Sequence, residues 1–156
     1  MNPEIVPVPE SDKAALWEML QAYIAELSVY AGVEPVEGVY RYAPFERYWS
    51  EEGRFPFWAM VGDKRAGFAL VWHDRGNGVF RMAEFYVAPQ FRRTTIGGAF
   101  AHRVLRSFPG HWKIRQIARN TGAVAFWRKT LARYGYTEEN FHDRGLERFE
   151  QSFVVG

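Results

Sequence analysis

Apolar residues recur with helical spacing near the start of the chain. Leu16, Leu20, Ile24 and Leu27 follow one another at intervals of four, four and three residues, which predicts an amphipathic helix. Ser11 and Asp12 stand just before it, and side chains of both types cap helix N-termini. After this helix, Tyr and Trp residues crowd residues 31–52 between several Gly and Pro, and a short second helix is predicted at residues 45–50.

Two further helices are predicted in the second half of the chain. Ile96, Phe100 and Val104 are spaced by four residues, and Pro109 followed by Gly110 ends that segment. Residues 122–134 have a helical pattern that ends at Gly135.

The remaining apolar segments predict strands. Gly62-Asp63-Lys64 is a hairpin signal between two of them. The predicted strands cover residues 5–8, 57–61, 66–72, 79–87, 112–117 and 146–155. The full order of elements, β-α-α-β-β-β-α-β-α-β-β, has a seventh strand after the last helix. It predicts one domain over residues 1–156 of the α/β (α+β) class, with a mixed, mostly antiparallel sheet and helices on both faces.

Composition excludes several classes of protein. The 156 residues are 47% hydrophobic, 17% aromatic and 24% charged, which excludes a disordered or low-complexity chain. Cys is absent, which excludes a disulfide scaffold, a thiolate nucleophile and a Cys-ligated zinc site. The four His residues show no metal-ligand spacing, so no metal is expected. Because no apolar run could span a bilayer and the first residues lack a signal-peptide pattern, we expect a cytoplasmic protein with no membrane partner.

The charges are segregated along the chain. Residues 85–137 contain no Asp or Glu and ten basic residues, whereas the rest of the chain has ten Lys and Arg against 18 acids. A block of one sign attracts a ligand of the opposite sign, so this block predicts a phosphate-bearing partner. The alternative is that the two regions are ordinary solvated faces.

A candidate anion site lies between the strand at residues 79–87 and the next helix. Arg92 and Arg93 precede Thr94-Thr95-Ile96-Gly97-Gly98, where the helix is expected to begin. Unpaired amides and the helix dipole favour a phosphate at such an N-terminus, and glycine lets it approach the backbone closely. The alternative reading of two adjacent glycines is close packing of the helix on the strand.

Together with residues 120–127, this segment resembles the GNAT superfamily of acyl-CoA-dependent N-acyltransferases. Val87-Ala88-Pro89 matches the end of the family's strand, residues 92–99 match its Arg-x-x-Gly-x-Gly/Ala loop, and Asn120, Ala123 and Phe126 match the opening of its last helix. The resemblance implies a GNAT-like sheet of about six to seven strands flanked by about four helices, and acetyl-CoA as co-substrate.

The same resemblance implies roles for particular residues. Val87 would pair its backbone with the pantetheine arm, Asn120 and Trp127 would contact the cofactor, and the loop would wrap the pyrophosphate. The loop residues concerned are Arg92, Arg93, Thr94, Thr95, Ile96, Gly97 and Gly98.

Two positions depart from the family pattern. Thr95 replaces the first glycine of the loop, and Trp127 replaces the tyrosine often assigned as the acid for the leaving thiolate. An indole N–H is no usable proton source. Tyr134, two helical turns further on, could substitute, or solvent could protonate the thiolate directly.

Glu84 is the candidate general base. It is the acid nearest the reacting end of the strand at residues 79–87, where the family often places its base, and burial would raise its pKa towards a useful value. The alternative is that Glu84 points outward or pairs with an arginine. The family builds its acceptor pocket from the region matching the aromatic stretch at residues 23–58, and seven acids between Glu18 and Glu52 would suit a cationic amine. The alternative there is a plain core with solvated glutamates.

The preferred interpretation is an acetyl-CoA-dependent N-acetyltransferase that acts by direct transfer on a small-molecule or peptide amine. A non-catalytic acyl-CoA-binding module of the same fold comes second, and a nucleic-acid-binding domain using the basic block comes third. The apolar segment Phe153-Val154-Val155 could join a partner's sheet in a homodimer.

Overall fold

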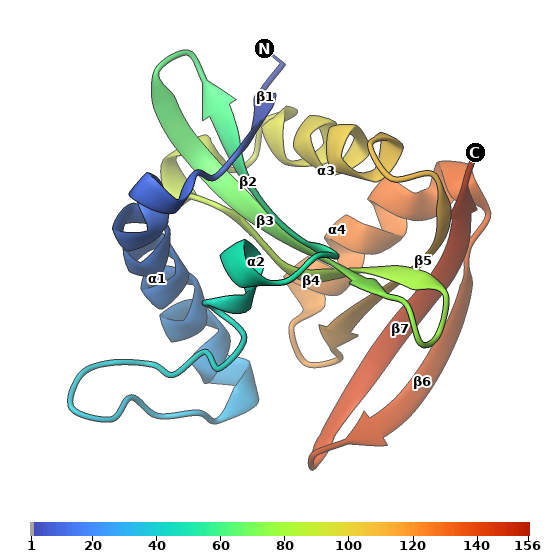
Figure 1. Cartoon of the computed structure of the whole chain (residues 1–156). Coiled ribbons are helices and arrows are strands. Elements are labelled where there is room, and N and C mark those ends of the chain that lie inside the picture. The colour runs from blue at the N-terminus through green and yellow to red at the C-terminus, as the bar shows by residue number, and fades with distance from the viewer. Residues whose placement is uncertain (1) are drawn as a thin grey trace.

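The computed structural model describes residues 2–156. They form one seven-stranded sheet in the order β1-β2-β3-β4-β5-β7-β6 (Figure 1). Every neighbouring pair is antiparallel except β4 with β5, so the predicted mixed, mostly antiparallel sheet is confirmed. The strands are β1 (Glu4–Pro7), β2 (Arg54–Val61), β3 (Lys64–Asp74), β4 (Val79–Val87), β5 (Gly110–Ile117), β6 (Thr137–Asp143) and β7 (Leu146–Val155).

Four α-helices cover the two faces of the sheet within residues 2–156. They are α1 (Lys13–Ala31), α2 (Arg47–Ser50), α3 (Ile96–Arg106) and α4 (Thr121–Leu131). Phe57 and Ala59 of β2 pack with α3 and α4, whereas Trp58 between them packs with α1 and α2. This alternation shows that α1 and α2 lie on one face and that α3 and α4 lie on the other (Figure 1). Over these residues, no helix has the length and apolar character needed to span a membrane.

Helix α1 begins where the sequence predicts, but its expected cap is wrong. Asp12 precedes the helix and makes no side-chain bond to its amides. Its Oδ2 atom instead accepts from Trp58 Nε1 at 3.0 Å and pairs with Arg65 at 3.2 Å. The carboxylate thus ties the start of α1 to the sheet.

Strands β4 and β5 are in register at two residue pairs, Phe80–Trp112 and Arg81–Lys113. Beyond them, the rest of β4 pairs with β3 and the rest of β5 pairs with β7. The two parallel strands therefore diverge in the middle of the sheet. On the other edge of β4 the register with β3 shifts between Leu70 and Val71, a β-bulge in which Ala83 is the extra residue.

The apolar chain end is part of the core. Phe153 and Val155 are buried, and Val154 between them is 52% exposed. This segment therefore offers one apolar side chain to a partner, and the predicted homodimer stays a prediction.

Gly67 tests the packing of β3 against β4. A Cβ atom at Gly67 would lie 2.0 Å from the carbonyl oxygen of Tyr86, a contact that requires the two strands to separate. We expect Gly67→Ala to lower the free energy of unfolding by at least about 2 kcal/mol in urea titrations. Gly122→Ala is the matched control, because nothing lies within 4 Å of its Cβ position. Equal stability of the two variants would contradict the described packing.

Candidate active site

Two adjoining cavities lie at the point where β4 and β5 diverge, and residues of α1 and α4 line both. The strand cavity, of about 700 Å³, lies between these strands and includes Glu84 and Arg115 in its wall. The loop cavity, of about 600 Å³, lies between α1 and the loop before α3, and includes Glu26 and Thr94. The cavities meet because six residues line both: Tyr23, Leu27, Phe85, Asn120, Ala123 and Trp127.

Glu84 lines the strand cavity beside this junction, next to Phe85, and is held by two tyrosines. Tyr23 of α1 donates to Oε1 at 2.8 Å, and Tyr42, in the segment before α2, donates to Oε2 at 2.9 Å. Burial raises the pKa of Glu84 to about 7, although the two hydrogen bonds oppose that shift. Burial and the nearby carboxylate raise the pKa values of Tyr23 and Tyr42, so both hydroxyls stay protonated and donate.

The alternative readings of Glu84 are therefore wrong. Its carboxylate points towards α1 rather than away from the fold, and within residues 2–156 it forms no ion pair. The β-bulge at Ala83 changes the alternation of side chains just before Glu84, which helps to direct it.

The loop before α3 presents unpaired backbone donors. Thr94 Oγ1 accepts from the Ile96 amide at 3.2 Å and donates to the Phe91 carbonyl at 2.9 Å, which holds the loop in place. Arg93 is in the left-handed conformation, with φ of 58°. Across residues 2–156 no acceptor is recorded for the amides of Arg93, Thr94, Thr95, Gly97 and Gly98. Residues 92–95 are exposed, so these donors are open to an anion.

The two glycines differ. A Cβ atom at Gly97 would lie 3.2 Å from the Phe126 ring, so close packing of α3 accounts for this residue. Nothing lies within 4 Å of the Cβ position of Gly98. Thr95, which replaces the family's glycine, precedes α3 and makes no side-chain cap bond.

Arg92 is paired with other groups of the protein and is not free to bind an anion at the open amides. Its Nε donates to the Val87 carbonyl at 2.7 Å, and its Nη2 pairs with Glu26 of α1 at 2.8 Å. The carbonyl expected to pair with a pantetheine arm is thus already occupied, and such pairing would require Arg92 to move. Arg93, in contrast, has no carboxylate in ion-pair range within the described residues.

Asn120, just before α4, and Trp127 of α4 lie at the junction of the cavities. Asn120 Oδ1 accepts from the Ala123 amide at 3.3 Å and caps the helix. Trp127 is buried and packs edge-on against Phe85, with ring centroids 5.0 Å apart.

Tyr134 is not brought to this site. It lies in a 3-10 turn after α4, where its hydroxyl is 2.9 Å from His102 Nδ1 and its ring stacks on Phe153. It lines neither the strand cavity nor the loop cavity. Its role as the acid stays a prediction that this geometry does not support.

The basic block of residues 85–137 does not form one surface. Arg92 and Arg93 line the loop cavity, and Lys113 and Arg115 line the strand cavity. A third group lies around His102, at a separate cavity on α3: Arg103, Arg106 and Arg133. The block from which a phosphate-bearing partner is predicted is therefore divided among three cavities, because successive elements carry these side chains in different directions.

The expected acidic acceptor pocket is also absent from the described residues. Of the seven acids between Glu18 and Glu52, Glu26 is the one that lines either cavity. Others form surface ion pairs, such as Glu46 with Lys13. The strand cavity is instead lined by five basic residues, three of them outside the basic block: Arg81, Lys113, Arg115, Arg144 and Arg148.

Comparisons with known proteins agree with this geometry. The model of the acetyltransferase (GNAT) family matches residues 16–132. Spermidine N-acetyltransferase from Vibrio cholerae, solved in complex with CoA and spermine, has a TM-score of 0.74 and 12% identity over 99% of this chain and 96% of that one.

Two further solved structures have the same fold. An acetyltransferase from Thermus thermophilus has a TM-score of 0.75 and 13% identity over 99% of this chain and 98% of that one. The protein smu.2055 from Streptococcus mutans UA159 has a TM-score of 0.71 and 21% identity over 98% of this chain and 99% of that one. No curated protein sequence matches the chain.

The raised pKa of Glu84 predicts a pH-dependent cost in stability. Between the ordinary pKa of 4.5 and about 7, the folded protein keeps a proton that the unfolded chain releases, so stability falls as pH rises through this window. Glu84→Gln removes this cost. We expect the variant's stability relative to wild type to rise by about 3 kcal/mol between pH 4.5 and pH 8 in urea titrations.

Glu138→Gln is the control for this measurement. The hydrogen bond from Arg128 is the main cause of the lowered pKa of Glu138. The ionised carboxylate therefore stabilises the fold throughout this range, and that stabilisation is lost only below pH 4.5. Its stability difference from wild type should stay flat between pH 5 and pH 8. A flat difference for Glu84→Gln as well would show that Glu84 has an ordinary pKa.

Proposed function

The chain belongs to the GNAT family of acetyltransferases, and on this premise we propose that it transfers an acetyl group from acetyl-CoA to an amine, with Glu84 as the general base. The observation that carries the proposal is the position of Glu84 in the strand cavity, hydrogen-bonded to Tyr23, which lines both cavities. One cavity has the open amides of a diphosphate site, and the other is free for an acceptor.

The residues of the loop cavity fit coenzyme A. Its diphosphate is an oxyanion that needs several donors at once. The amides of Arg93, Thr94, Thr95, Gly97 and Gly98 have no competing acceptor in the described chain, and three of these residues, Arg93, Thr94 and Gly97, line the loop cavity. Arg93 adds an unpaired positive charge. The thioester end of the molecule would then extend along the loop cavity towards Glu84, past Phe85 and Trp127.

Glu84 is suited to take the proton of the amine. A primary amine has a pKa near 10.4 and is mostly protonated at neutral pH, so it must lose a proton before it can attack. A carboxylate with a pKa of about 7 is partly ionised there and is a stronger base than an ordinary glutamate. Tyr23 and Tyr42 hold both of its oxygens, so the carboxylate is fixed in position.

The transfer is direct because the chain has no Cys to carry the acetyl group. One proton of the ammonium passes to Glu84, the neutral amine nitrogen then attacks the thioester carbonyl carbon, and the carbon–sulfur bond breaks to release the thiolate of coenzyme A. The second proton of the nitrogen leaves to solvent as the amide forms. A thiolate with a pKa near 8.5 needs little help in leaving and can take a proton from solvent. Holding the amine and thioester together supplies much of the rate.

Glu84→Gln tests the base. We expect kcat/KM for an accepted amine to fall by roughly 10²- to 10⁴-fold, because general base catalysis is lost while the shape of the site is kept. The wild-type profile should rise with pH through an apparent pKa of about 7, and this limb should be missing in the variant. Release of free thiol is the measurement.

Tyr134→Phe is the companion variant in the same assay. Its hydroxyl is directed to His102, so we expect kcat to change little. A large loss of kcat in this variant, with Glu84→Gln still active, would show that Tyr134 and not Glu84 acts in the reaction.

Arg93→Gln tests the loop cavity. We expect acetyl-CoA to bind roughly tenfold more weakly in calorimetry, since one charge-assisted contact is lost. The control is Arg106→Gln, at the other end of α3 and lining neither of the two main cavities. If acetyl-CoA does not bind the wild-type protein, the proposed function is wrong.

A further inference from the structure

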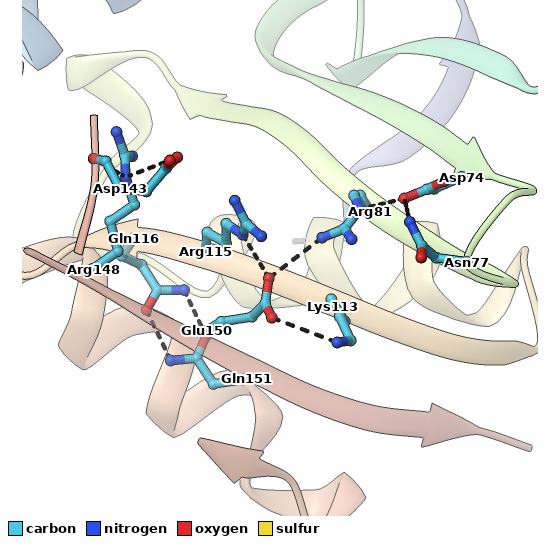
Figure 2. A network of polar contacts seen from close by, with 10 residues as sticks. All are labelled: Asp74, Asn77, Arg81, Lys113, Arg115, Gln116, Asp143, Arg148, Glu150 and Gln151. Carbon is cyan, nitrogen blue, oxygen red and sulfur yellow. Dashed lines mark hydrogen bonds and ion pairs between the residues drawn. The ribbon is translucent and has the colours of Figure 1, made fainter. Parts of the chain in front are cut away.

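The wall of the strand cavity is built from cations that share one buried carboxylate. Arg81 of β4 and Arg115 of β5 both donate to Glu150 Oε2, and the Lys113 ammonium lies 3.6 Å from Oε1 (Figure 2). Arg81 also donates to Asp74 at 3.1 Å. Three cations are therefore paired with only two carboxylates, Glu150 and Asp74, which leaves one positive charge uncompensated.

The charges in this wall are layered. The side chain of Glu150 is 5% exposed, whereas those of Lys113 and Arg115 are 35% and 44% exposed. The carboxylate lies beneath, and the cations form the surface that a ligand would meet. Although burial would raise the pKa of Glu150, the hydrogen bond from Arg115 and the charges of its three partners lower it, so Glu150 stays ionised and holds the cations in place.

Arg115 has N–H groups that are not paired within the described residues. Its Nε is used by Glu150, but no acceptor for its terminal nitrogens is recorded within residues 2–156. Its guanidinium carbon lies over the Phe141 ring, 5.0 Å from the centroid, and this cation–π contact helps to hold the group in place. A planar guanidinium with free terminal N–H groups is suited to a carboxylate or phosphate.

The rest of the cavity does not cancel this charge. Arg148 is 3.9 Å from Asp143, and Arg144 has no carboxylate in ion-pair range in the described part of the chain. Counting Glu150 beneath the wall, five cations face four carboxylates, and one of the four is Glu84, which is partly protonated at neutral pH.

The wall is also close to the base. Arg81 and Lys113 are the last registered pair before β4 and β5 diverge, and Glu84 is three residues further along β4, roughly 10 Å at strand spacing. Arg115 is two residues further along β5, on the opposite side of the opening. Because Glu84 and Arg115 line the same cavity, one small molecule inside it could contact both.

We propose that the acceptor is a small amine that also carries an oxyanion, a carboxylate or a phosphate, and that Arg115 and Lys113 bind this oxyanion while the amine lies at Glu84. The proposal rests on the proposed acetyl transfer and names the class of acceptor. It replaces the cationic acceptor expected from the acids of residues 18–52.

The first experiment uses the wild-type protein and acceptors of matched shape. With acetyl-CoA, thiol release is measured for 4-aminobutyrate, its neutral amide and 1,4-diaminobutane, and for the same three end groups on shorter and longer chains. O-phosphoethanolamine against ethanolamine separates phosphate from carboxylate. We expect the anionic member at the best length to exceed its neutral partner roughly 10- to 100-fold in kcat/KM. Preference for the neutral or cationic member overturns the proposal while leaving acetyl transfer intact.

The second experiment removes the charge at one position. Arg115→Gln should abolish the preference for the anionic acceptor over its neutral partner, mainly by raising KM for the anionic acceptor. Arg128→Gln is the control, because this arginine is equally exposed and ion-paired, to Glu138, but lines neither main cavity. An unchanged preference in Arg115→Gln overturns the proposal.

Binding gives a readout that does not depend on turnover. Calorimetry with the same amines, in the presence of CoA, should show tighter binding of the anionic member, lost in Arg115→Gln. That result without thiol release would support the anion site and contradict acetyl transfer. Absence of binding by every anionic member would contradict the anion site.

Discussion

The divergence of β4 from β5 is the constraint on which the rest of the site depends. Parallel pairing stops after Arg81 and Lys113, and each strand keeps its other neighbour, so the sheet stays intact while its middle opens. Had the pairing continued, the backbones would lie about 4.8 Å apart and no ligand could enter between them. The opening brings together the end of the loop cavity, the carboxylate of Glu84 and the cations of the strand cavity, Lys113 and Arg115.

Glu84 and Glu150 show how one cavity gives two carboxylates opposite properties. Both are withdrawn from water, which favours the protonated form. Neutral tyrosine hydroxyls are the only recorded partners of Glu84 in the described chain, and its pKa rises to about 7. Three cations surround Glu150, and its pKa falls. The first can exchange a proton near neutral pH, and the second is a fixed charge that organises arginines.

The sequence predicted the elements well because local patterns determine them. Apolar spacing gave α1 and α3, and the Gly62 turn gave the β2–β3 hairpin. The open amides of the loop followed from the position of the helix start. What the sequence could not show were contacts between distant segments, such as Arg92 with Glu26, which removes that arginine from the loop. The charged wall of the strand cavity could not be predicted for the same reason. Alternation in β5 shows that Lys113 and Arg115 share a face, but it does not show that β7 places Glu150 beneath them.

A crystal structure with acetyl-CoA tests the central claim most directly, since that claim concerns where one molecule lies. The account predicts the diphosphate on the amides between Arg93 and Gly98, with the thioester carbonyl at the opening between β4 and β5 and beside Glu84. A diphosphate bound away from that loop, or a thioester that ends far from Glu84, would contradict it.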